Sequence, residues 1–301
     1  MSFKRSVYNL IPFKKQLFGA FRSLFGPPGM FESLRFNGKF KIPVKEYDTS
    51  FYLHNASDLH RETDLFWRGI FTAYESVSLK SWAAISKEGT VVLDVGANTG
   101  IFSMLAKAIN PKAKVVAFEP IPYNIQLLKK NIAANDFDIE VVEKAISNEV
   151  GSCTMYVKPD TVNYMTSVNT NREENSETVE LEVPIISIDQ FVKDAHFEKV
   201  DMIKLDVEGH EPEALQGALE VIRRDLPTML VEVLSDEDGL KIMEILKPFP
   251  YQFYQIEENY VDPKDSTAKR VETLKYNKGQ NFLICTDETA NWLTKKGIAL
   301  S

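Results

Sequence analysis

Apolar runs that alternate with helical segments constrain the fold of this 301-residue chain more than any other feature. Four such runs are each followed by a segment of helical periodicity: VVLDV (91–95), KVVAFE (114–119), VDMIKLD (200–206) and TMLVEVL (228–234). Strands that alternate with helices form a parallel sheet, because each crossover returns through a right-handed helix that covers one face. We therefore predict an α/β fold with a mostly parallel, Rossmann-like sheet and helices on both faces.

The remaining patterns predict how this sheet is extended. Residues 36–53 alternate between apolar and polar and predict a β-hairpin, whereas residues 63–86 predict one helix. Further strands are expected at 139–146, 153–157 and 179–188, helices at 122–135, 212–224 and 238–247, and a polar loop at about 158–178. The runs YQFYQI and NFLICT lack a long helix between them, which indicates an antiparallel edge strand. The chain thus divides into an N-terminal extension (1–60) and a Rossmann-like domain (61–301).

Composition limits the partners and the compartment. The formal net charge of -8 argues against nucleic acid as a partner, because phosphate binding favours a basic surface. The two cysteines, Cys153 and Cys285, are far apart and fit a reducing environment better than a disulfide framework. No apolar run approaches the ~18 residues of a membrane span. We therefore expect a cytoplasmic protein.

The first 29 residues predict a basic amphipathic helix that ends at GPPG. Basic residues occur here without any acid before Glu32, and an apolar stripe lies along one helical face: Phe13, Leu17, Phe21, Leu24 and Phe25. Such stripes most often pack on the protein's own core or on a second subunit, and we expect the same of this helix. Peripheral contact with an anionic membrane is the alternative, and a homo-oligomer stays open.

A glycine-containing turn follows the first parallel strand, in VVLDVGANTGIFS. Its glycines, Gly96 and Gly100, let the backbone approach a ligand, and the helix N-terminus favours a negative group. Glu119 ends the next strand about 20 residues later, where an acid can accept hydrogen bonds from ribose hydroxyls. The dinucleotide fingerprint would place glycines where this chain has Asn98 and Ile101, which argues against NAD and FAD. A carboxylate attached to adenosine suits the turn better, as in S-adenosylmethionine (SAM).

These motifs, with IKLDVEGHE and PTMLVEV, resemble the FkbM family of SAM-dependent methyltransferases. The resemblance runs from about Glu75 to Cys285 and leaves the first 60 residues outside. It implies O-methylation of a hydroxyl on a glycan, a glycolipid or a natural product. It also implies a set of cofactor-binding residues: Glu75, Asp94, Gly96, Ala97, Asn98, Gly100, Glu119, Pro120, Glu143, Ala145 and Asp206. Tyr74 would help Glu75 to close the pocket.

The stretch IKLDVEGHEPEAL (203–215) places Asp206, Glu208 and His210 directly after a buried strand. Glu211 and Glu213 have a structural explanation, because acids near a helix N-terminus stabilise it. Asp206 ends an apolar strand, where an unpaired charge is costly without a partner. Removing the proton of an attacking hydroxyl speeds its methylation, so we expect Asp206, Glu208 or His210 to act as the base.

Three alternatives stay open at this point. Asp206, Glu208 and Glu232 can instead hold Mg²⁺ or Ca²⁺, although the sequence gives no ligand geometry and we predict no metal site. A nicotinamide oxidoreductase with the same sheet is a second alternative. The third is a catalytically silent protein that its N-terminal helix recruits to a membrane or a partner.

Overall fold

The computed structural model describes residues 14–25, 35–56, 59–73, 75–159, 161–162, 178–258, 267–276 and 281–301. Tyr74, Phe13 and most of the polar stretch predicted as a loop lie outside the described residues. None of the described helices is long and apolar enough to cross a membrane.

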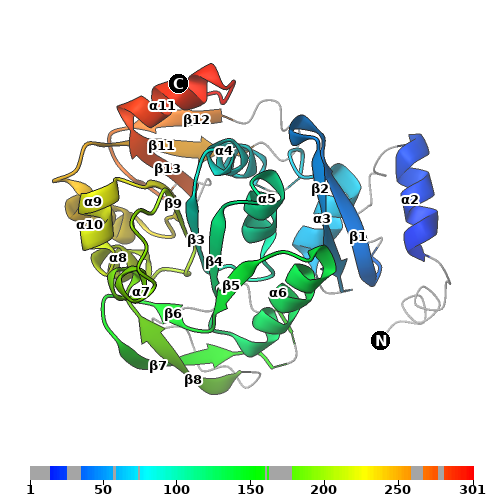
Figure 1. Ribbon diagram of the computed structural model, residues 1–301, viewed down its shortest axis with the longest axis horizontal. Coiled ribbons are helices and arrows are strands. Elements are labelled where there is room, and N and C mark those ends of the chain that lie inside the picture. Colours follow the sequence, from blue (N-terminus) through cyan, green and yellow to red (C-terminus); the bar gives the residue numbers. More distant parts are fainter. Residues whose placement is uncertain are drawn as a thin grey trace.

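An eight-stranded sheet forms the centre of the molecule, in the order β12-β11-β13-β10-β9-β3-β4-β5 (Figure 1). Its parallel strands are β3 (Val91–Val95), β4 (Lys114–Phe118), β5 (Ile139–Val142), β9 (Met202–Leu205) and β10 (Thr228–Glu232). Three strands extend it antiparallel to their neighbours: β11 (Tyr251–Glu257), β12 (Thr267–Val271) and β13 (Asn281–Thr286). The predicted α/β sheet with an antiparallel edge is confirmed, and that edge contains three strands.

Side chains of the parallel strands alternate between two hydrophobic cores. Val92 of β3 and Val115 of β4 belong to one core, and the next residues, Leu93 and Val116, belong to the other. The first core contains α4 (Ser76–Ser86) and α5 (Ile101–Ile109), and the second contains α7 (Ile188–Asp194), α8 (Glu211–Gln216), α9 (Leu219–Asp225) and α10 (Asp236–Leu246). Helices on both faces therefore bury this sheet, as predicted for parallel strands. Two more helices are α6 (Pro122–Asn135), on the side of the first core, and α11 (Asp287–Lys295) beside β13.

The predicted hairpin is present as β1 (Gly38–Val44) and β2 (Thr49–Asn55). Its apolar residues belong to the first core, with α4 and α5, and the amide of His54 donates to Asn131 of α6 over 2.8 Å. The division into an extension and a domain stays a prediction.

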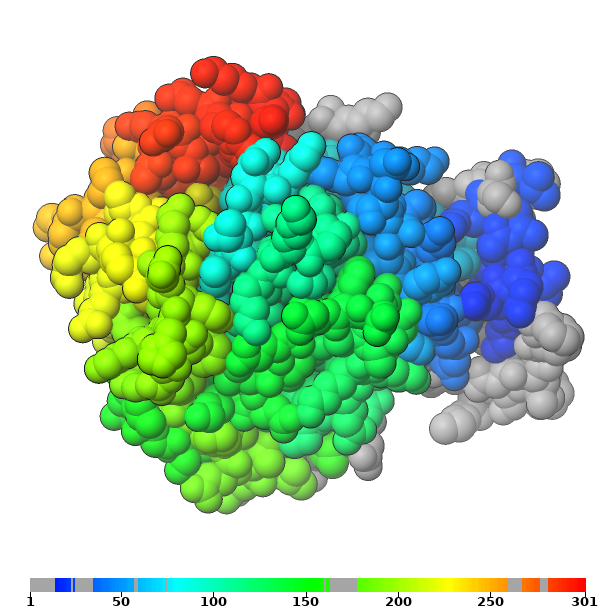
Figure 2. Space-filling view, viewed as in Figure 1, coloured from blue at the N-terminus to red at the C-terminus, as the bar shows by residue number. Residues whose placement is uncertain are grey.

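The basic amphipathic helix is also present, as α2 (Lys14–Phe25), and it ends where GPPG begins. It lies at the edge of the molecule beside the hairpin (Figure 2). Its contacts with α3 (His60–Arg68) are made by Phe18, whose ring centroid lies 5.4 Å from that of Trp67, and by Arg22 over the ring of Phe66. Leu17, Phe21 and Leu24 of the predicted stripe are exposed instead.

Several predicted boundaries are wrong, because tertiary contacts break the elements. The helix expected at 63–86 is two helices: α3 ends before Gly69, whose φ is 92°, and α4 begins only at Ser76. The helix expected at 212–224 breaks at Gly217, where a Cβ would lie 2.1 Å from the carbonyl oxygen of Ser147.

The strand expected at 139–146 also divides. Residues 145–146 form β6 and leave the central sheet for a three-stranded sheet with β7 (Gly151–Val157) and β8 (Val179–Ile186). The prediction missed α7, β12 and α11. Ser187 ends the predicted strand at 179–188 early, because its side chain accepts the amide of Gln190 and caps α7.

Candidate active site

The glycine-containing turn lies at the carboxyl edge of the sheet, between β4 and β9. The amides of Gly96 and Ala97 both donate to the carbonyl oxygen of Phe118 over 3.0 Å. Gly96 has a φ of 75°, and a Cβ at this position would lie 1.8 Å from the carbonyl oxygen of Asp206. Only glycine therefore lets the turn approach the end of β9 so closely.

Two neighbouring cavities open at this edge. The first is lined by Gly96, Asn98, Glu119, Pro120, Ala145, Asp206 and Glu208, among others. The second shares Gly96, Asn98 and Asp206 with the first and adds Glu75 and Ala97. Most of the residues that the sequence assigned to a cofactor thus line one connected region.

Glu119 is buried in the wall of the first cavity and holds the turn in place. Its Oε2 accepts the amide of Asn98 over 2.8 Å, and its Oε1 accepts the amide of Ile121 over 3.0 Å and the side-chain amide of Asn124 over 3.3 Å. Burial raises the pKa of Glu119 to about 7, although these three hydrogen bonds oppose the rise. The carboxyl therefore changes its charge near neutral pH.

Asp206 forms a buried ion pair at the end of β9. Its Oδ2 lies 2.8 Å from Nζ of Lys204, which also lies 5.0 Å from the ring centroid of Phe102. Burial by itself would raise the pKa of Asp206, but the positive charges of Lys204 and Arg61 outweigh it and hold the pKa below its usual range. Asp206 is therefore a carboxylate that faces the cavity at neutral pH.

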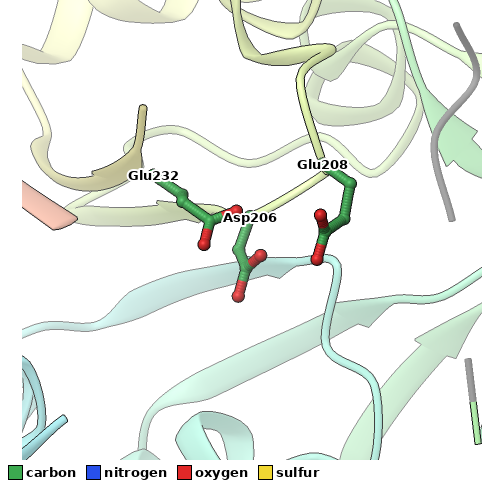
Figure 3. Close-up of side chains that lie close together, drawn as sticks. All are labelled: Asp206, Glu208 and Glu232. Atoms are coloured by element: carbon green, nitrogen blue, oxygen red, sulfur yellow. The ribbon is translucent and has the colours of Figure 1, made fainter. Parts of the chain in front are cut away.

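Glu208 and Glu232 converge on Asp206, as Figure 3 shows. Each of the three carboxylates contributes an oxygen within 4.8 Å of the other two. Glu208 follows β9 with a φ of 59°, and Glu232 ends the neighbouring strand β10. Burial, together with the charges of Asp206 and Glu208, raises the pKa of Glu232 to about 10. The fold thus brings together three acids that the sequence offered only as an alternative, a cation site.

Four other predicted residues lie outside the linings of these two cavities: Gly100, His210, Glu143 and Asp94. Gly100 precedes α5 with a φ of 88° and packs against Leu128. His210 is buried against Ser147, whose Oγ lies 3.0 Å from Nε2, and burial lowers the pKa of His210. Glu143 forms an exposed ion pair with Lys129. Asp94 is buried, where Ser103 donates to it over 2.5 Å and burial raises the pKa of Asp94.

The sequence accounts for Glu211 as an acid that stabilises a helix N-terminus, and the structure shows an additional role for this residue. It is buried in the first turn of α8, and its two oxygens accept the amides of Val207 and Gly209 over 2.8 and 3.0 Å. Burial raises the pKa of Glu211 to about 8. Its hydrogen bonds fix the backbone on both sides of Glu208.

Sequence reasoning missed Arg61, which lines both cavities from α3. No motif surrounds it, and it lies about 145 positions before its neighbour Asp206 in the chain. Its neighbour Glu62 accepts a hydrogen bond of 2.5 Å from Thr99 in the turn, so α3 contacts the turn directly. No signal in the sequence distinguishes Arg61, because the helix predicted at 63–86 begins two residues after it.

The sheet, the turn after β3 and the acid after β4 define a methyltransferase-like α/β protein. A model of the methyltransferase FkbM domain matches residues 94–259, which is more than half of the chain, and the protein therefore belongs to this SAM-dependent methyltransferase family. The family resemblance and the predicted enzyme class are thereby confirmed, and the oxidoreductase alternative is wrong.

Relatives of known activity are similar at low identity. The hexuronic acid methyltransferase AglP of Haloferax volcanii is 27% identical over 203 residues, which cover 67% of this chain and 77% of the relative. The 31-O-demethyl-FK506 methyltransferase FkbM of Streptomyces tacrolimicus is 25% identical, over 59% of this chain and 76% of the relative. A crystal structure of a methyltransferase FkbM from Methylobacillus flagellatus aligns with a TM-score of 0.43 at 18% identity, over 66% of this chain and 44% of that one.

Proposed function

We propose that this protein transfers a methyl group from SAM to a hydroxyl of a glycan, a glycolipid or a natural product. The observation that carries the proposal is the cavity whose wall combines the glycine turn, Glu119 and Asp206. Relatives named for hexuronic acid and for 31-O-demethyl-FK506 support an oxygen acceptor on a small molecule or sugar. The net charge of -8 continues to disfavour nucleic acid.

The residues of the cavity fit a sulfonium nucleoside. Glu119 is an acid at the end of β4, where ribose hydroxyls can donate to it, and Pro120 and Ala145 give a less polar wall for a base. Asp206 and Glu208 add negative charge opposite the turn, which suits a cation such as a sulfonium. When bound, SAM supplies an electrophilic methyl carbon.

Asp206 and Glu208 are the groups of this chain best placed to receive the acceptor's proton. As the hydroxyl oxygen bonds to the methyl carbon, the carbon–sulfur bond breaks and its electron pair stays on sulfur. The hydroxyl proton then moves to a carboxylate, which is the step that a base assists. We assign this role to Asp206 before Glu208, and we assign His210 to the support of the loop because of its buried contact with Ser147.

We predict that SAM binding strengthens about tenfold between pH 6 and pH 8. With a pKa of about 7, roughly a tenth of Glu119 is ionised at pH 6 and roughly nine tenths at pH 8. Because the ionised carboxylate accepts hydrogen bonds from ribose hydroxyls better than the acid, the affinity follows that fraction. Isothermal titration calorimetry at the two pH values measures the change.

The variant Glu119→Gln tests whether Glu119, and not another buried acid, causes this pH dependence of SAM binding. It should bind SAM more weakly than the wild type at pH 8, and its affinity should be nearly independent of pH. An equally steep pH dependence in this variant would assign the effect to another group and remove Glu119 from the ribose site.

We further propose that α2 makes peripheral contact with anionic membranes. Leu17 and Leu24 are 56% and 73% exposed, and Lys14 and Lys15 lie on the same helix, which contains no acid. Wild-type protein should float with vesicles that contain anionic phospholipid, and a Leu17→Ser, Leu24→Ser variant should float at least several-fold less. If the variant floats equally well, or if it loses only a dimer seen by sedimentation, this surface binds protein instead.

The acceptor is found by transfer of a labelled methyl group. We expect mass spectrometry of a cell extract, incubated with the protein and labelled SAM, to show the label on an oxygen of a glycan, a glycolipid or a related small molecule. Both cysteines are free thiols, which fits a site of action in the reducing cytoplasm. A label found on nitrogen or on nucleic acid would refute the proposal, and no label at all would favour the catalytically silent alternative.

A further inference from the structure

The three carboxylates at the ends of β9 and β10 are close enough to share one ion. Oxygens of Asp206, Glu208 and Glu232 lie within 4.8 Å of one another, and the three side chains point toward a common region (Figure 3). Two ligands of one Ca²⁺ ion can be at most about 5 Å apart, and two ligands of Mg²⁺ at most about 4.2 Å. The observed spacing fits Ca²⁺ as it stands and fits Mg²⁺ after a shift of several tenths of an ångström.

Glu232 provides a second and independent sign of a ligand. Its side chain is buried, with an exposed fraction of 6%, in a place where a carboxyl oxygen without a partner is costly. Among the residues that the structure describes, no donor forms a hydrogen bond with its Oε2, and the side chain has Asp206, a member of the same cluster, as a hydrogen-bond partner. A buried carboxyl oxygen that no donor contacts and that is directed into an acidic cluster is a ready ligand for a cation.

Strand pairing and hydrogen bonds hold the backbone of the three acids in place. Asp206 and Glu232 stand at the ends of paired parallel strands. Glu208 lies in a loop whose flanking amides, those of Val207 and Gly209, are both held by Glu211. Ligands held on such supports require little reorganisation when they bind.

We propose that Asp206, Glu208 and Glu232 bind one divalent cation, Mg²⁺ or Ca²⁺, at the edge of the cavity. Three carboxylates leave coordination positions for water and for an acceptor hydroxyl, since these ions take six or more oxygen ligands. A cation in this place lowers the pKa of a bound hydroxyl and orients its oxygen. This catalytic role rests on the proposed function, whereas metal binding itself does not.

The test uses the full chain and the metal alone, without SAM. Calorimetry with MgCl₂ and CaCl₂, and electron paramagnetic resonance with MnCl₂ as a spectroscopic probe, should each show saturable binding of one ion per chain. A wild-type protein that is folded by circular dichroism and binds SAM, but shows no saturable binding of any of the three ions, would overturn the inference and leave the proposed function intact.

Variants locate the ion. Glu232→Gln and Glu208→Gln keep the size of each side chain, and each should weaken metal binding at least about tenfold, because each removes a charged ligand. The matched control is Glu244→Gln, an exposed acid on α10 that pairs with Lys247, and it should bind the ion like the wild type. Unchanged affinity in both cluster variants would place the ion elsewhere and refute the site.

A methyl-transfer assay then separates the two proposals. If the cation assists the reaction, activity should fall on treatment with a chelator and return with added Mg²⁺ or Ca²⁺. Metal binding in a chain that transfers no methyl group would support the site and count against the function. Activity that survives complete removal of the metal would restrict the ion to a structural role and refute its part in the reaction.

Discussion

Replacing Asp206 by asparagine should reduce kcat by about 10²–10⁴-fold while the affinity for SAM stays within a few fold. The carboxylate is held ionised beside Lys204 at 2.8 Å, and it lines both cavities. Asparagine has nearly the same shape but accepts a proton poorly and binds a cation weakly. Initial rates with an identified acceptor, together with calorimetry for SAM, measure the two effects separately.

The control for Asp206→Asn is a double variant that also replaces Lys204, the partner of Asp206 in the ion pair. Asparagine leaves the ammonium of Lys204 buried without a counter-charge, which can cost about 3–5 kcal/mol of stability. The double variant Lys204→Met, Asp206→Asn removes both charges and should regain much of that stability, yet it should stay inactive. Activity in the double variant would show that Asp206 acts only as a structural partner of Lys204.

Replacing Gly96 by alanine should destabilise the protein by about 3 kcal/mol or more and abolish SAM binding in whatever protein still folds. The added Cβ would lie 1.8 Å from the carbonyl oxygen of Asp206, a backbone atom that cannot move without displacing β9. Overpacking of this kind costs about 1–3 kcal/mol or more, and the positive φ of 75° adds about 1 kcal/mol. Urea denaturation measures the loss.

Gly297→Ala is the matched control. Gly297 also has a positive φ, of 85°, but a Cβ there would have no atom within 4 Å. This variant should therefore lose only about 1 kcal/mol, the cost of the backbone conformation alone. Equal losses in the two variants would mean that the close approach of the turn to β9 is not what requires glycine.

Much of the sheet could be predicted because its signals are local. Val91–Val95 and Lys114–Phe118 are short apolar runs bounded by turn residues, and a parallel strand buried on both faces requires such a run. Glycine at 96 and an acid at 119 follow from the same pattern, because ligands of an open α/β sheet lie beyond the carboxyl ends of its strands. These features identified the family before any contact was known.

The elements that were missed depend on contacts between distant segments. The helix expected at 212–224 breaks because Gly217 packs on the backbone of Ser147. No pattern near Gly217 in the sequence predicts this contact. His210 is withdrawn from the cavity by the same segment, since its ring lies against Ser147. Arg61 reaches both cavities only because α3 packs beside the turn.

By itself, the sequence determined the α/β sheet, the SAM-dependent methyltransferase family and the line of acids along the strand ends. Each of these depends on residue type and on spacing within one segment. Only the tertiary structure decided that Glu232 of β10 meets Asp206 and Glu208 of the loop after β9, whereas Glu143 pairs with Lys129 at the surface. Strand pairing and side-chain burial set these distances, and both depend on packing across the whole molecule rather than on any one stretch of the chain.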